Sequence, residues 1–210
     1  MRKLIVSMNI TLDGFLSGPN CELDWHFTSW TAEMAEALCE QLKKADTILL
    51  GRVTYLAMAK FWPAKALDST VAPADLIFIR MMNQYPKIVF SKMLFTTAWN
   101  NSIIQKNLAS TIQNLKKQSG KDLMVYGSAT LVAALVHLNL VDEYQLWVHP
   151  IVLGRGKPLF KNVPGQSRLT LLKNQLFSSG VVLLMYQVQN PGNPIKNRKN
   201  KNNHEKEIAD

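Results

Sequence analysis

Short apolar segments of strand length alternate with longer amphipathic segments over most of this chain. The short segments predict strands over residues 4–10, 47–50, 87–90 and 123–126, and near 103–104. Such alternation is typical of an α/β domain with a mostly parallel sheet. The last third differs, because segments 144–149, 169–177 and 181–188 follow one another without long helices between them. Ser179-Gly180 is expected to join the last two in an antiparallel hairpin.

The longer segments predict helices over residues 31–44, 52–60, 73–83 and 128–138, and from about 108 to a stop before Gly120. In the first, Thr31 is the expected N-cap and two faces are separated. The apolar face comprises Met34, Ala35, Leu38, Cys39 and Leu42, and the charged face comprises Glu33, Glu36, Glu40 and Lys43. Pro63 is expected to stop the second helix, and Pro73 suits the first turn of the third. The predicted fold is a mixed, mostly parallel central sheet flanked by helices, with a C-terminal antiparallel hairpin.

The composition of the chain predicts a single domain and a cytoplasmic location. With 210 residues, 47% of them apolar, the chain can form a single core without a metal or a disulfide. No apolar run approaches the roughly 20 residues of a membrane span, and no secretory signal is evident. Cys21 and Cys39 form no CxxC pair, which predicts reduced thiols and a cytoplasmic protein.

The net charge of +9 is divided between a domain, residues 1–189, and a basic polar tail, residues 190–210. The tail holds five Lys or Arg and three acidic residues, so it contributes +2 and leaves +7 for the domain. Its composition predicts disorder. A basic tail can bind nucleic acid non-specifically, but this one has no aromatic residue to stack on bases, so solubility is the preferred explanation and no specific nucleic-acid partner is expected.

Candidate chemistry gathers where predicted strands end. Gly51-Arg52-Val53-Thr54 and Gly127-Ser128-Ala129-Thr130 each lie between a strand and a helix, and Ser91-Lys92 follows a third strand. In open α/β sheets, ligands bind beyond the carboxyl ends of the strands, where helix N-termini suit phosphates. Each junction alone could be a turn or an N-cap, but three together fit a ligand with several phosphates, such as a dinucleotide. No GxGxxG fingerprint is present, which disfavours a Rossmann domain.

Several segments resemble the dihydrofolate reductase-like superfamily, in the branch that includes the reductase domain of bacterial riboflavin biosynthesis. They are MNITLDG (8–14), DTILLGRVTY (46–55), PKIVFSK (86–92), DLMVYGSATL (122–131), LVDEYQLWVHPIVLGRGKPLF (140–160) and SSGVVLLMY (178–186). The resemblance implies an NADPH-dependent reductase resembling 5-amino-6-(5-phosphoribosylamino)uracil reductase, acting on a C=O or C=N of a small, pyrimidine- or pterin-like substrate. Many members are homodimers, so a homodimer is expected.

The resemblance also implies roles for individual residues. Gly51, Arg52 and Thr54 would hold cofactor phosphates, and Ser91 with Lys92 would meet the 2′-phosphate that distinguishes NADP(H) from NAD(H). The pyrophosphate would lie on the next junction, formed by Gly127, Ser128, Ala129, Thr130 and Leu131. Asp13 and Gly14 would lie near the nicotinamide and substrate.

Two departures from the family bear on the substrate. The bifunctional enzymes of the family show a DDP-containing segment shortly after the second strand, implicated in binding the sugar-phosphate substrate. This chain reads LAMAKFWPAKALDS (56–69) there, which argues against a ribosyl-phosphate substrate. Riboflavin-pathway proteins often carry an N-terminal zinc deaminase domain; this sequence shows no His/Cys ligand set of that kind, and no metal site is expected. Glu33, Glu36 and Glu40 are predicted to face solvent, so folate reduction is not supported either.

Hydride transfer requires mainly that donor and acceptor be held close and water excluded. Asp13 is the preferred group to orient the acceptor or relay a proton; alternatively it forms an Asx turn with Gly14. Trp25 belongs either to a lid over the substrate or to a plain loop anchored by a buried ring. His26, His137 and His149 are scattered and show no metal-ligand spacing.

Two other functions fit the same sequence. One is a non-catalytic NADP(H)-binding or interaction protein on this fold, suggested by the missing sugar-phosphate segment. The other is a nucleic-acid binder that uses the basic surface.

Overall fold

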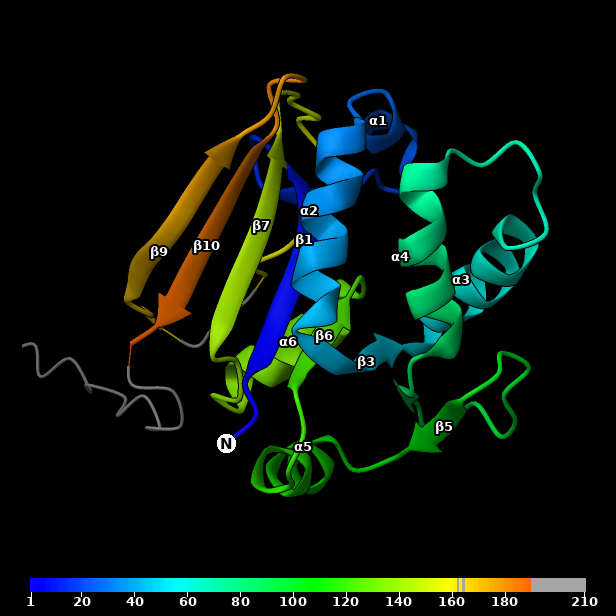
Figure 1. Cartoon of the computed structure of the whole chain (residues 1–210). Helices are drawn as coiled ribbons and strands as arrows, with labels where there is room; N and C mark the ends of the chain where they lie inside the picture. The colour runs from blue at the N-terminus through cyan, green and yellow to red at the C-terminus, as the bar shows by residue number, and fades with distance from the viewer. Residues whose placement is uncertain (162, 164, 190–210) are drawn as a thin grey trace, which may run out of the picture.

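The computed structural model describes residues 1–161, 163 and 165–189, so the predicted tail lies outside the described residues. An eight-stranded sheet has the order β5-β4-β3-β6-β1-β7-β10-β9 (Figure 1). Its strands are β1 (Leu4–Thr11), β3 (Ala45–Gly51), β4 (Lys87–Phe90), β5 (Ser102–Gln105), β6 (Asp122–Tyr126), β7 (Glu143–His149), β9 (Leu169–Leu176) and β10 (Val182–Val188). The first six strands in this spatial order are parallel, and β10 and β9 are added antiparallel, as predicted. The predicted fold class is confirmed.

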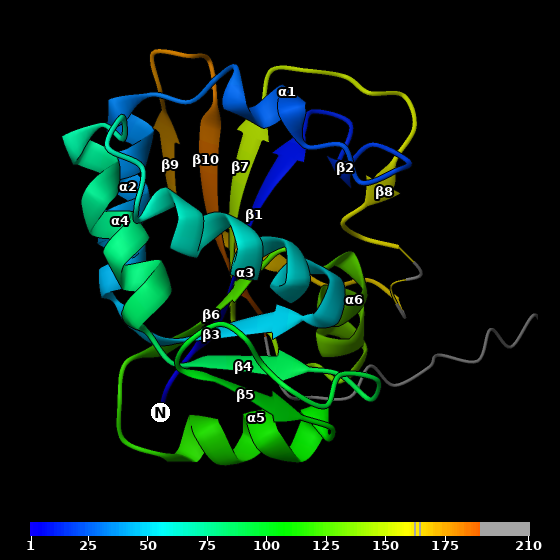
Figure 2. The same ribbon diagram turned by 90° about the vertical axis from the view of Figure 1, so that its right-hand side faces the viewer.

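Helices cover both faces of the parallel part of the sheet (Figures 1 and 2). They are α1 (Asp24–Phe27), α2 (Ala32–Lys43), α3 (Arg52–Lys65), α4 (Pro73–Gln84), α5 (Leu108–Lys117) and α6 (Ala129–His137). On one face, apolar side chains of α2, α3 and α4 share a core with β3. On the other, α5 and α6 pack on β1 and β6. The stripe predicted on α2 is buried or half-buried, and its four charged positions are exposed.

The structure corrects the expected end of the second helix, because α3 continues through Pro63 to Lys65. A proline this close to a helix end removes only one hydrogen bond of the last turn. Trp62 holds that turn by packing on Phe78 of α4, with ring centroids 5.4 Å apart. Three short elements were not expected from the sequence: α1 and the two-stranded pairing of β2 (Phe15–Ser17) with β8 (Lys157–Pro158).

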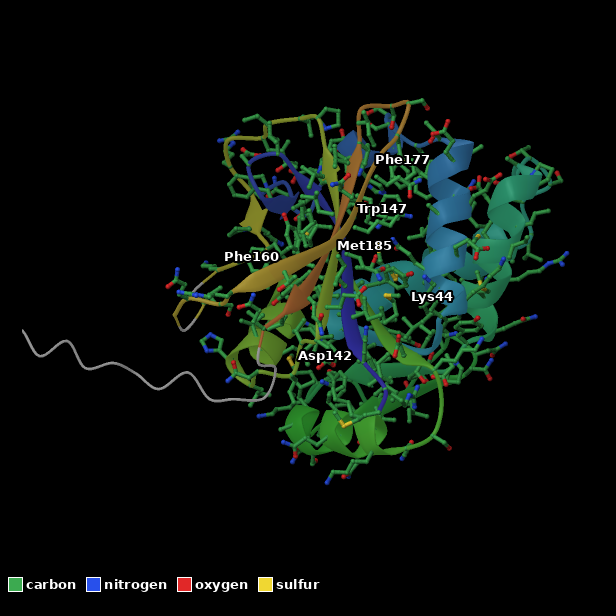
Figure 3. The ribbon with its side chains drawn as sticks, turned by 60° about the vertical axis from the view of Figure 1, so that its left-hand side comes forward. Lys44, Asp142, Trp147, Phe160, Phe177 and Met185 are labelled. Carbon is green, nitrogen blue, oxygen red and sulfur yellow. The ribbon has the colours of Figure 1, made fainter. Side chains whose placement is uncertain are left out.

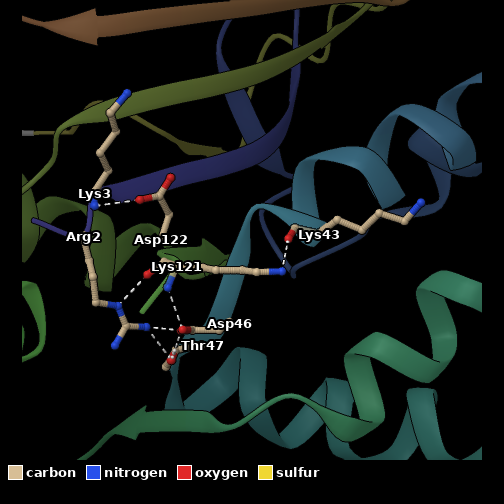
Figure 4. A network of polar contacts seen from close by, with 7 residues as sticks. All are labelled: Arg2, Lys3, Lys43, Asp46, Thr47, Lys121 and Asp122. Atoms are coloured by element: carbon tan, nitrogen blue, oxygen red, sulfur yellow. Dashed lines mark hydrogen bonds and ion pairs between the residues drawn. The ribbon is translucent and has the colours of Figure 1, made fainter. Parts of the chain in front are cut away.

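A buried arginine ties together the amino ends of the central strands (Figure 4). Arg2 is 7% exposed; its Nε donates to the carbonyl of Lys121 at 2.5 Å, and its Nη2 donates to Thr47 Oγ1 at 2.9 Å. The same Nη2 forms an ion pair with Asp46, which also accepts from the Lys121 amide at 2.8 Å. The start of β1, the start of β3 and the turn before β6 are therefore joined by one guanidinium. Arg2, Asp46 and Lys121 line a surface hollow at this edge of the sheet, and their polar groups bind one another there.

We expect Arg2→Met to lower the free energy of unfolding by about 2 kcal/mol, because it leaves Asp46 and the Lys121 carbonyl without their donor. Urea unfolding measures the change. Lys43→Met is the matched control, because the Lys43–Glu40 pair is exposed and its loss should cost at most about 0.5 kcal/mol. Equal losses in the two variants would contradict this role for Arg2.

Candidate functional site

Parallel pairing brings the predicted junctions to the same edge of the sheet. Gly51 at the end of β3 lies opposite Phe90 of β4, so Ser91 is its neighbour on one side. On the other side β3 pairs with β6, with Leu49 opposite Val125, so Gly51 and Gly127 end at the same level. The three strand ends predicted to hold a cofactor therefore lie next to one another.

Two of these junctions pack tightly against each other. A Cβ atom on Gly51 would lie 2.2 Å from Ser128 Oγ, and one on Gly127 would lie 2.5 Å from Thr54 Cγ2. Gly127 and Ser128 also have φ angles of +64° and +62°, a conformation that a glycine adopts readily and a serine rarely. Both glycines are thus explained by the close approach of the two turns, which places the N-termini of α3 and α6 side by side.

The first turns of α3 and α6 have a charge pattern that favours anions. Neither contains an acidic residue, and Gly51 provides no side chain to cap α3. Ser128 Oγ accepts from the Leu131 amide at 3.3 Å, which uses one donor of α6. Helix N-termini carry partial positive charge and free N–H groups. With half-buried Arg52 at the start of α3, this pair of turns can hold a phosphate-bearing ligand.

Ser91 and Lys92 differ from the other two junctions, because no helix follows β4 directly. Ser91 Oγ instead accepts from the amides of Met93 at 3.1 Å and Leu94 at 2.9 Å, which closes a local turn. The side chain of Lys92 is exposed, beside the end of β4. Lys92 can therefore supply a mobile charge, whereas the hydroxyl of Ser91 is already used as an acceptor.

The edge of the sheet has a step between β6 and β1. Ser7 of β1 pairs with Tyr126 at the end of β6, but β1 continues with β7 as far as Thr11, which lies opposite His149. Four further residues at about 3.3 Å each extend these strands by about 13 Å beyond β6. A ligand on the first turns of α3 and α6 would thus have the projecting ends of β1 and β7 beside it.

Asp13 lies beyond the end of β1 and is anchored by three donors. Its carboxylate accepts from Thr11 Oγ1 at 2.5 Å, from the Gly154 amide at 2.8 Å and from the Leu153 amide at 3.3 Å. The hydrogen bond from Thr11, supported by those from the two amides, lowers the pKa of Asp13. An ionised, anchored carboxylate suits positioning better than proton relay. Gly14 follows with a φ of +82° in the turn that this anchoring holds.

Trp25 lies on α1 and is 7% exposed, with its ring edge against the imidazole of His149 at 5.1 Å between centroids. His149 is fully buried, and its Nε2 is 3.0 Å from Asn9 Oδ1. Burial and the neighbouring His26 lower its pKa to about 4, so the ring is neutral near pH 7. With Nε2 donating to Asn9, Nδ1 carries a lone pair. Among the described residues, neither His149 Nδ1 nor Trp25 Nε1 has a hydrogen-bond partner.

The Asn9–His149 pair is the feature of this edge that the sequence analysis missed. The two residues are 140 positions apart, and only the pairing of β1 with β7 brings them together. Both lie near the carboxyl ends of expected strands, which is the one signal that could have pointed to them.

Within the described part of the chain, no group of three or more His, Cys, Asp or Glu side chains is arranged to hold a metal ion. In the same part, every helix is too short or too polar to cross a bilayer.

Comparisons with known proteins agree with this architecture. The family model described as RibD C-terminal domain matches residues 2–183. Uncharacterized protein YyaP of Bacillus subtilis (strain 168) is 34% identical over 185 residues, which cover 88% of this chain and 94% of that protein. Uncharacterized protein YwjB of the same organism is 23% identical over 182 residues, which cover 87% of this chain and 96% of that protein.

Two solved structures show the same fold. A putative riboflavin biosynthesis protein from Shewanella sp. PV-4 is similar with a TM-score of 0.68 and 18% identity, covering 89% of this chain and 99% of that one. A Thermotoga maritima diaminohydroxyphosphoribosylaminopyrimidine deaminase/5-amino-6-(5-phosphoribosylamino)uracil reductase has a TM-score of 0.61 at 15% identity; the match covers 90% of this chain and 57% of that one. The expected dihydrofolate reductase-like fold is thereby confirmed.

The packing of the two turns predicts a specific rescue. Gly51→Ala should lower the free energy of unfolding by about 1–3 kcal/mol, because its methyl group would overlap Ser128. Adding Ser128→Gly removes the obstructing atoms at a position that already has a positive φ, so the double variant should recover most of the loss. Urea unfolding of both variants, with Ser128→Gly alone as control, measures this. A double variant no more stable than Gly51→Ala would show that the turns do not limit each other.

The buried His149 predicts a pH dependence of stability. Its pKa is about 4 in the folded protein against 6.5 for an ordinary histidine, so the unfolded chain binds a proton first as the pH falls. Stability should therefore decline between pH 6.5 and 4, with a contribution from His149 of about 2 kcal/mol at about pH 5. Unfolding at about pH 7.5 and about pH 5 should show a smaller decline for His149→Gln than for the unsubstituted chain. His137→Gln, at an exposed position, should decline as the unsubstituted chain does.

Proposed function

This chain belongs to the RibD C-terminal domain family, and from that premise we propose that it is a reductase that transfers hydride from NADPH to a C=O or C=N bond of a small heterocycle. The observation that carries the proposal is the pair of acid-free helix first turns, packed side by side at the carboxyl edge of the sheet. This arrangement fits the pyrophosphate of a dinucleotide. The Thermotoga relative is named as a reductase of an aminouracil, which supports a pyrimidine- or pterin-like substrate.

The residues predicted to hold NADPH fit this placement. The amides of Arg52, Ala129 and Thr130 belong to the first turns that would face the pyrophosphate, and Gly51 and Gly127 let those turns approach each other closely. Lys92 follows Phe90, the residue of β4 that lies opposite Gly51, by two positions; its side chain is exposed and can meet a 2′-phosphate. The nicotinamide, when bound, supplies the hydride.

The substrate would lie at the step, beside the projecting ends of β1 and β7. There His149 Nδ1 offers a lone pair and Trp25 Nε1 offers a proton. An acceptor and a donor together match the adjacent N–H and C=O of a lactam, such as occurs in pyrimidine and pterin rings. Both atoms are covered in this structure and Trp25 belongs to α1, so a shift of α1 would have to open a space between Trp25 and His149 to admit a substrate. Asp13 would hold the neighbouring loop in place rather than transfer a proton.

The alternative is a protein that binds NADP(H) on this fold without turnover. The segment Leu56–Ser69 (LAMAKFWPAKALDS) favours it in one respect, since it lacks the acidic DDP sequence expected for a sugar-phosphate substrate. Oxidation of NADPH with a pyrimidine, pterin or carbonyl acceptor distinguishes the two, because only a reductase consumes the cofactor.

We expect Lys92→Ala to raise the dissociation constant for NADPH about tenfold and to leave that for NADH unchanged, because only NADPH carries the 2′-phosphate. Quenching of tryptophan fluorescence by each coenzyme measures both constants. Lys44→Ala is the matched control, since Lys44 is an exposed lysine that follows α2 at the amino end of β3, away from the candidate site (Figure 3). Loss of NADPH and NADH binding to the same degree would contradict the assignment of Lys92. A chain that binds neither coenzyme would overturn the proposed function itself.

A further inference from the structure

Asn9 and His149 reach each other diagonally across two parallel strands at the carboxyl edge of the sheet. In the pairing of β1 with β7, Asn9 lies opposite Trp147 and Thr11 lies opposite His149. Opposite residues of neighbouring strands share a side of the sheet, and so do residues two apart on one strand. All four side chains therefore point to the side on which Trp147 packs with Met34 of α2.

Of the two residues of β1 beside His149 on this side, only Asn9 is available to it. Thr11 is occupied by its own turn, because its Oγ1 donates to Asp13 at 2.5 Å and accepts from the Phe15 amide at 3.0 Å. Asn9 Oδ1 lies 3.0 Å from His149 Nε2, and among the described residues this is the only hydrogen bond of the Asn9 side chain. Asn9 therefore decides the hydrogen bonding of Nε2.

The oxygen of Asn9 selects one tautomer of the imidazole. A neutral imidazole carries a single N–H, and the hydrogen bond at one ring nitrogen fixes the role of the other. Because Asn9 Oδ1 can only accept, the proton lies on Nε2 and the lone pair lies on Nδ1. Burial and the nearby ring of His26, with centroids 6.2 Å apart, disfavour a second proton and lower the pKa of His149 to about 4. Near pH 7, Nδ1 thus accepts hydrogen bonds and donates none.

This acceptor is buried and lacks a partner within the part of the chain that the structure describes. Native proteins pair nearly all such atoms, with protein groups, water or ligands. The Trp25 ring, at 5.1 Å between centroids, cannot satisfy it from its edge-on position, since Trp25 Nε1 is itself without an acceptor. A hydrogen-bond donor on a ligand is the group that Nδ1 lacks.

The nitrogens of a heterocyclic substrate differ in whether they can supply that donor. A lactam nitrogen carries a hydrogen, whereas the nitrogen of a C=N bond has only a lone pair, which would face the lone pair of Nδ1. An alkylated or glycosylated ring nitrogen has no hydrogen to donate either. Sites built around a hydrogen bond to a substrate N–H reject analogues without it strongly, because the buried partner is left unpaired.

We infer that Asn9 is a positioning residue that determines substrate specificity. It holds His149 in the tautomer that accepts at Nδ1, so the site takes heterocycles with an unsubstituted ring N–H at that point. The inference rests on the proposed function for the place of the substrate, and it adds the residue that selects and the substituents that are excluded. The bond that is reduced then belongs to another part of the ring, because the nitrogen of a C=N bond cannot face Nδ1.

Nitrogen–hydrogen correlation spectra of the imidazole rings test the first step without a ligand. The unsubstituted chain should show His149 protonated at Nε2 alone near pH 7, with its signals assigned by their loss in His149→Gln. Asn9→Leu removes the acceptor, so the two nitrogen shifts of His149 should move toward each other, as in a mixture of tautomers. Asn9→Asp keeps an oxygen acceptor, so Nε2 should stay protonated, and its negative charge should raise the pKa of His149. This rise tests the contact independently of Asn9→Leu.

The same signals, followed during titration, measure the binding of two probes. They are uracil, which has ring N–H groups, and dimethyluracil, in which both ring nitrogens carry a methyl group. The unsubstituted chain should bind dimethyluracil at least about tenfold more weakly than uracil. Asn9→Leu should bind the two within about threefold of each other, and Asn9→Asp, above the pKa of its His149, should discriminate as the unsubstituted chain does.

Ser7→Ala is the matched control, because Ser7 lies two positions before Asn9 on the same side of β1 and contacts Trp147 instead. It should change neither the tautomer nor the discrimination. A proton on Nδ1 in the unsubstituted chain, equal binding of the two probes, binding of neither, or discrimination that survives in Asn9→Leu would overturn the inference. Failure of the proposed function has a different signature: a chain that distinguishes the probes but binds no NADPH would refute the reductase and not the role of Asn9.

Discussion

The close approach of two strand–helix turns is the constraint on which the candidate site depends. β3 and β6 are neighbours in the sheet, and the helices that follow them leave toward opposite faces. Their first turns can lie side by side only because Gly51 and Gly127 have no Cβ atom to meet Ser128 and Thr54. If either turn were displaced by a side chain, the two helix N-termini would separate, and the paired positive ends that suit a dinucleotide would be lost.

Buried polar groups tie segments together at the amino edge of the sheet. At the amino edge, Arg2, Asp46 and Lys121 satisfy one another and close the ends of three segments. Lys87 at the start of β4 is similarly occupied, because its ammonium donates to three carbonyls at the end of α4 and lies 4.3 Å from the centre of the Trp99 ring. At the carboxyl edge, buried polar atoms of His149 and Trp25 lack partners among the described residues. Unsatisfied buried groups are costly, so these two atoms, which belong to rings in contact with each other, are candidates for hydrogen bonds from a ligand.

The parallel and antiparallel parts of the sheet differ in how helices cover them. The parallel part has helices on both faces and forms its own core. The antiparallel hairpin is covered on one side by α2, whose Met34 shares a cluster with Phe177 and Leu183. The reductase proposal rests on the first part.

The sequence alone determined the order and type of nearly all the long elements, because burial on one face or both imposes a repeat that can be read locally. It also located the glycines at the ends of β3 and β6, since glycine after an apolar run indicates a turn. It did not show that α3 passes through Pro63, because the packing of Trp62 on Phe78 decides that end. It could not show the short helix α1 or the turn closed by Ser91, which depend on single hydrogen bonds and contacts. Above all, the pairing of Asn9 with His149 across 140 positions arises from strand order. The order of the strands depends on how the whole core packs, so it cannot be predicted from a local pattern of residues.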